Sequence, residues 1–141
     1  MKRLARFFRL APRDRRLVIE AALMLAVSGV LLSLFRFQRL ARHLGRHMSE
    51  SGAVEPAQAR QAGDRIGWAV TGVAHVLPWH PVCLPQAVAA KLMLRRRGIP
   101  STLYMGIDSR GYDAHAWVRV GDRIVTGGPA TERFSVVSTF S

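Results

Sequence analysis

The chain has 141 residues, of which 49% are hydrophobic and 21% charged, so it suits one globular domain and excludes wholesale disorder. Its single cysteine excludes a disulfide framework and zinc sites built on two or four cysteines, and it fits a reduced, cytosolic compartment. The formal net charge is +12, of which residues 1–47 carry +9, as eleven Lys and Arg less two acids. A basic end of this kind suits a nucleic acid, an anionic membrane, an acidic partner or a solvated helix face.

The first part of the chain is predicted to be helical. Residues 12–47 favour one helix, because Pro12 suits a helix start and few helix breakers follow it. Residues 49–63 are small and polar and predict a loop with at most a turn of helix. Residues 65–77 favour a second, shorter helix that ends before Pro78.

An apolar stretch within the first helix has to be weighed as a membrane span. It runs from Leu17 to Phe35 and its only charged residue is Glu20. The run without any charge begins at Ala21 and is short for a span, and arginines flank it on both sides, so the positive-inside rule assigns no orientation. We therefore expect a buried core helix, with a peripheral membrane contact through this N-terminal helix as the alternative.

The only cysteine lies in the stretch PWHPVCLPQA, residues 78–87, at the start of a predicted helix that runs to Arg97. Pro85 falls in the first turn of that helix, where its missing N–H has no cost, and Gly98 closes the helix. A helix N-terminus presents unpaired N–H groups and the positive end of the macrodipole, and both stabilise a thiolate. Cys83 is therefore a candidate nucleophile, although a small buried cysteine in a core is the plainer alternative.

Strand formers replace the helical pattern after Pro100. Four strands are predicted, at residues 102–107, 114–120, 123–127 and, in the segment FSVVSTF, 134–140. Gly121 and Asp122 form a two-residue hairpin signal between the second and third of these strands. Helices followed by an antiparallel sheet predict an α+β fold.

A thiol enzyme also needs a base, and the chain offers five histidines: His43, His47, His75, His80 and His115. His115 opens a strand, with Trp117 on the same face, so it is suited to face Cys83 on the neighbouring helix. Trp117 is interpreted as strand packing or as a wall of the substrate cleft, and His80 as part of the loop or of an oxyanion pocket. His43 and His47 lie one helical turn apart without a third ligand, so no metal site and no cofactor are predicted.

These segments together resemble a known family. The start CLPQA at Cys83, then LRRRGIP at residues 94–100 and HAWVRV at residues 115–120, are similar to the bacterial transglutaminase-like fold. More narrowly, they resemble the lasso peptide biosynthesis B2 protein, a stand-alone leader peptidase with a papain-like cysteine protease core. The specific match covers about residues 78–128, and the basic N-terminal arm is also typical of that family.

The resemblance implies a function and a division of the chain. Cys83 would be the nucleophile and His115 the general base and acid in removing the leader from a ribosomally made precursor peptide. The implied partners are the precursor peptide, a separate B1-type leader-recognition protein and an ATP-dependent lasso cyclase. Residues 1–47 would form a basic helical arm of the same fold, residues 48–77 a loop and short helix, and residues 78–141 the transglutaminase-like catalytic core.

One position departs from the pattern of the family. The family places an Asp about twelve residues beyond the histidine, where this chain has Gly127. A backbone carbonyl or Thr126 is left to orient His115, and the third catalytic role stays unassigned. Two other functions remain open: a non-catalytic interaction protein on the same scaffold, and a basic module for membranes or nucleic acid. The last ranks lowest, because the arm lacks a base-reading motif, and no nucleic-acid partner is predicted.

Overall fold

Helices precede strands along the chain, in agreement with the predicted α+β class. The computed structural model describes residues 1–52 and 56–141. The helices of this part are α1 (Lys2–Arg9), α2 (Pro12–Leu34), α3 (Phe37–Leu44), α4 (Ala57–Ala74) and α5 (Cys83–Arg96). The strands are β1 (Thr102–Asp108), β2 (Ala114–Val120), β3 (Arg123–Thr126) and β4 (Phe134–Phe140), with the short 3₁₀ helix η1 (Pro129–Arg133) before β4.

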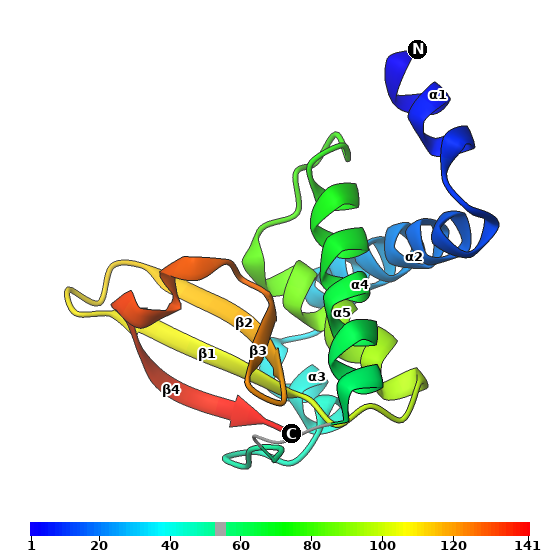
Figure 1. The fold of residues 1–141 in the computed structure, drawn as a ribbon. Coiled ribbons are helices and arrows are strands. Elements are labelled where there is room, and N and C mark those ends of the chain that lie inside the picture. Colours follow the sequence, from blue (N-terminus) through cyan, green and yellow to red (C-terminus); the bar gives the residue numbers. More distant parts are fainter. Residues whose placement is uncertain (53–55) are drawn as a thin grey trace.

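The four strands form one antiparallel sheet in the order β3-β2-β1-β4. In Figure 1 the sheet lies on one side of the molecule and the helices on the other, with α1 standing apart from the sheet. Helices α4 and α5 pack against the sheet, and α2 packs against both of them. The core therefore lies between the sheet and the pair α4 and α5, with α2 as a further layer.

Helix α5 can approach the sheet closely because its buried face is built mainly from small side chains, among them Ala87, Val88 and Ala90. The same face carries one buried cation, Lys91, whose ammonium group donates hydrogen bonds to the backbone oxygen and the hydroxyl of Ser101. These bonds compensate in part for the desolvation of the charge. Helix α5 is thereby fixed to the strand that follows it.

The single helix predicted over residues 12–47 is wrong at two points, a break after Leu34 and an end at Leu44, beyond which His47 forms a β-bridge with Phe140. The chain breaks after Leu34, where Phe35 and Arg36 are extended, and α3 begins at Phe37. No Gly or Pro causes this break. It lets α3 turn back and pack: Ala41 and Leu44 are buried, and the ring of Phe37 meets that of Phe140 edge to face at 5.7 Å. Tertiary packing here overrides a continuous helical propensity.

The loop predicted over residues 49–63 is wrong from Ala57 onward, because α4 begins there; its residues 53–55 lie outside the described part. The run AQARQA consists of strong helix formers. Gly67 lies against β3 so closely that a Cβ there would be 2.0 Å from the backbone oxygen of Val125. The absence of a side chain at Gly67 therefore permits the close approach of α4 to the sheet.

Helix α2 is buried along one face and not around its whole circumference. Leu17, Ala21, Leu25 and Ser28 are buried, as the core prediction expects. Its length and composition also meet the requirement for a membrane span, although core helices and signal sequences meet it too, and only 22% of its most apolar window is buried. Much of the apolar surface of α2 therefore faces outward.

Candidate active site

Cys83 is the first residue of α5, at the position that the sequence predicts. Val82 before it is extended, and Pro85 in the first turn leaves no N–H to be satisfied. The backbone N–H groups of Cys83 and Leu84 have no partner within a helix at this position, so they are suited to bind an anion. Cys83 is a free cysteine of intermediate exposure, and it packs in part against the hydrophobic core.

His115 lies on β2, the strand that packs against α5. Its ring stacks on those of Trp117 and Phe134, with centroid distances of 5.8 Å and 4.9 Å. Its Nε2 lies 2.6 Å from the backbone oxygen of Gly127. A carbonyl oxygen only accepts hydrogen bonds, so Nε2 must carry the hydrogen and donate it. In the neutral ring Nδ1 is then left as the basic atom.

Cys83 and His115 border one cavity of about 550 Å³. The walls of the cavity come from α4, α5, β2, β3 and the segment after β3. Its lining consists of Thr71, Cys83, Gln86, His115, Ile124, Val125, Thr126, Gly127, Gly128 and Pro129. The fold thus brings together the two residues that the sequence selects from positions 32 apart, and it gives them a common space for a substrate.

Gly127 supplies a backbone oxygen where the family pattern has an Asp side chain. Its φ is +102°, and a Cβ there would lie 2.3 Å from the Cβ of Trp117. No other residue fits this position without a shift of the backbone. The glycine therefore lets the chain turn so that its carbonyl meets His115. Of the two groups that the sequence leaves open for this contact, the carbonyl makes it, and the hydroxyl of Thr126 does not.

The hydroxyl of Thr126, unlike the carbonyl of Gly127, makes no hydrogen bond with the described residues. It is buried and it borders the cavity. Gln86 also borders the cavity, and its side-chain nitrogen donates a hydrogen bond to the oxygen of Pro81 at 2.8 Å. That bond fixes the loop that leads to Cys83. Sequence reasoning gave Gln86 no role, although its place three residues after Cys83 puts it on the same helix face.

Other residues singled out in the sequence lie elsewhere. His80 is exposed with a φ of +39°, and it is not among the described residues that line the cavity. Trp117 is buried and packs between strands, stacking on Tyr104 at 5.4 Å as well as on His115, so it supports the histidine from behind. Within residues 1–52 and 56–141, no group of three or more metal-ligating side chains occurs.

A comparison with protein-family models shows to which superfamily the chain belongs. The family model of the transglutaminase-like superfamily matches residues 24–139, from within α2 to the last but one residue of β4. The chain belongs to the transglutaminase-like superfamily. This family includes cysteine peptidases. No curated protein and no solved structure matches the chain.

The family match extends well beyond the segments around Cys83 and His115. It takes in α3, α4 and the C-terminal part of α2, from Met24 onward, so these segments are part of the transglutaminase-like domain. Helix α1 and residues 12–23 of α2, about half of that helix, lie outside the match. A catalytic function of the two residues remains a prediction, for which the domain supplies a thiol at a helix start and a histidine that border one cavity.

Proposed function

We propose that the chain is a cysteine peptidase that removes the leader from a ribosomally made lasso peptide precursor. The observation that carries the proposal is that Cys83 and His115 border the same cavity, with the ring of His115 fixed through Nε2. The substrate class comes from the resemblance of CLPQA, LRRRGIP and HAWVRV to the leader peptidases of this pathway. The proposed partners are a separate leader-recognition protein and an ATP-dependent cyclase, in the reduced cytosol that a free thiol suits.

The proposed reaction proceeds in two stages. The thiolate of Cys83 attacks the carbonyl carbon of the scissile peptide bond, and the N–H groups of Cys83 and Leu84 hold the resulting oxyanion. Protonated His115 then gives its proton to the leaving amine, the C–N bond breaks, and a thioester remains on Cys83. In the second stage His115 takes a proton from water, the hydroxide attacks the thioester, and the carboxylate product and the thiol are released.

The test is incubation of the purified chain with a candidate precursor peptide and its leader-binding protein, followed by mass analysis of the products. We expect cleavage after the leader by the wild type. Cys83→Ala and His115→Ala should each reduce its rate by at least ~1000-fold while the fold is retained.

A matched control is His75→Ala. His75 is exposed directly after the end of α4, where its Nδ1 contacts the oxygen of Thr71, and it is not among the described residues that border the cavity. We expect this variant to cleave at the wild-type rate. Wild-type cleavage by either active-site variant contradicts the proposal, as does a wild-type chain that binds its partner and cleaves nothing.

A further inference from the structure

The outward face of α2 carries a continuous apolar stripe. Its members recur at intervals of three or four residues, which places them on one side of the helix: Ile19, Leu23, Val27, Val30 and Leu34. All five are exposed, and the stripe is about 22 Å long at the usual rise of a helix. The opposite face of α2 is already buried in the domain through Leu17, Ala21 and Leu25. Helix α2 is therefore apolar on two sides, and the domain covers only one of them.

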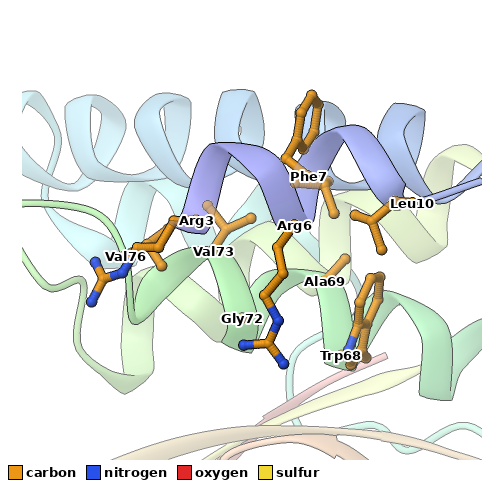
Figure 2. A pocket seen from close by; sticks show the side chains of 10 residues that line it. Arg3, Arg6, Phe7, Leu10, Trp68, Ala69, Gly72, Val73 and Val76 are labelled. Atoms are coloured by element: carbon orange, nitrogen blue, oxygen red, sulfur yellow. The ribbon is translucent and has the colours of Figure 1, made fainter. Parts of the chain in front are cut away.

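Helix α1 has the same character. Phe7 and Leu10 border a cavity of about 480 Å³ between α1 and α4, together with Trp68. Figure 2 shows α1 passing over α4, with the labelled side chains of both helices around this cavity. Leu4 and Phe8, one helical turn apart, are exposed instead, and no residue of α1 is buried. Helix α1, which directly precedes α2 in the sequence, therefore also presents apolar side chains to solvent.

Basic residues flank these apolar side chains in the sequence. Residues 1–47 carry eleven basic side chains and two acids, Asp14 and Glu20. Both acids are engaged by arginines from elsewhere, Asp14 by Arg65 and Glu20 by Arg96 and Arg97. Among residues 1–52 and 56–141, none of the ion pairs uses a basic side chain of α1 or α2. The basic charge of this end is therefore left for an external anionic partner.

We propose that α1 and the outward stripe of α2 bind the surface of an anionic lipid bilayer. Apolar side chains flanked by many Lys and Arg are the features by which a helix lies in a bilayer interface, with basic groups at the headgroups. Each basic residue near such a surface strengthens binding roughly fivefold. This binding goes beyond the proposed peptidase activity and does not depend on it.

The structure favours binding at the surface over spanning. To span, α2 would have to leave the domain and take Glu20 into the bilayer, away from its two bonds to Arg97 at 2.6 Å and 2.9 Å. The buried stripe would also lose its contacts with α4 and α5. With one face packed and the other free, α2 can lie along the bilayer while the domain stays folded.

The test is sedimentation of the full chain with vesicles of phosphatidylcholine, either pure or with phosphatidylglycerol at about one part in three. We expect binding to the mixed vesicles, weaker binding to the neutral ones, and release when salt rises from about 0.1 M to about 1 M, where the Debye length falls to about 3 Å. Val30→Glu and Leu23→Glu should each weaken binding by about tenfold or more, because each removes an apolar side chain and adds a repelled charge.

Val137→Glu is the matched control. Val137 on β4 is 50% exposed and Val30 is 56% exposed, so the two variants make the same change at the same degree of exposure. We expect Val137→Glu to bind as the wild type does, with circular dichroism to confirm that all variants fold. The proposal is overturned if the wild type does not bind mixed vesicles, if both stripe variants bind as the wild type does, or if salt and alkaline carbonate leave the chain in the bilayer. It is also overturned if the stripe is covered by a second copy, seen as a dimer that Val30→Glu dissociates and that does not bind vesicles.

Discussion

His115 is held at one nitrogen, and this determines which chemistry its ring can perform. Because the oxygen of Gly127 only accepts, Nε2 keeps its hydrogen and Nδ1 is the atom that can take or give a proton. A neutral carbonyl orients the ring as a carboxylate does, but it stabilises a positive imidazolium less. The stacked rings of Trp117 and Phe134 limit the remaining freedom of the ring. The hydrogen bond from His115 to Gly127, which replaces the contact with an Asp, therefore orients the ring more than it stabilises a positive charge on it.

Substitution of Gly127 tests this contact. Gly127→Ala should lower the free energy of unfolding by about 2 kcal/mol and slow precursor cleavage, because the new Cβ would meet Trp117 at 2.3 Å and the backbone lies at a φ of +102°. Gly127→Asp should lose activity too, although it introduces the family's residue. Gly128→Ala is the control: its φ is +65° but its Cβ meets nothing within 4 Å, so we expect a loss of about 1 kcal/mol. A stable, more active Gly127→Asp variant contradicts the account.

The burial of Lys91 leads to a second prediction, which concerns how the free energy of unfolding depends on pH. Burial, helped by the like charge of Arg95, lowers the pKa of Lys91 to about 8. Between that value and its ordinary pKa of 10.5, the unfolded chain holds a proton that the folded chain has lost, so the free energy of unfolding rises with pH. Relative to Lys91→Met, the wild type should gain about 2 kcal/mol between about pH 7 and about pH 9.5. Urea unfolding measures this gain, and parallel pH curves for the two proteins would contradict it.

Among the elements, α2 is attached to α5 by a polar clamp as well as by packing. Glu20 of α2 accepts two hydrogen bonds from Arg97 at the end of α5, and Arg96 lies 3.4 Å away. The hydrogen bond from Arg97 holds the pKa of Glu20 below its ordinary value against the opposing effect of burial. The clamp secures the apolar helix to the domain, and it leaves the outward stripe of that helix free.

Glu20→Gln should therefore destabilise the domain in a pH-dependent way. At about pH 7 we expect a loss of about 1 kcal/mol in the free energy of unfolding. Because the folded pKa is depressed, the stabilisation is complete above the ordinary pKa of 4.5 and is lost as pH falls through the lower folded value. Urea unfolding at a series of pH values measures the difference. Asp122→Asn, which removes the exposed pair with Arg60, should cost less than about 0.5 kcal/mol; an equal cost for both variants argues against the clamp.

The sequence predicts those helices and strands whose ends are marked by nearby residues. The helix from Cys83 is confirmed because its proline, its arginines and Gly98 mark both ends, and the strands after Pro100 are confirmed because their composition changes. The break at Phe35 is not marked by any residue and depends on the packing of α3. The sequence shows that Gly127 has no carboxylate with which to bind His115. Only the three-dimensional structure identifies the Gly127 carbonyl as the partner of that ring.

For the whole molecule, the central claim is that one helix and one strand of a transglutaminase-like domain present a thiol and an imidazole to a common cavity. Helix α5 lies across β2, so Cys83 at its start and His115 on the strand are positioned by regular elements and not by loops. Sites built in this way are held more firmly than sites built on loops. Helix α2 is clamped through Glu20 to Arg97, at the end of α5 opposite to Cys83.

The most direct test of this claim uses the single cysteine, because any alkylation of thiol in the intact chain reports on Cys83 alone. Iodoacetamide is added at about pH 6.5, and the mass of the intact protein is followed over time. The account predicts that the wild type is alkylated at least about tenfold faster than His115→Ala, since the thiolate is the reactive form and the proposed mechanism pairs it with the ring of His115. Equal rates for the two folded proteins would contradict the pairing of Cys83 with His115.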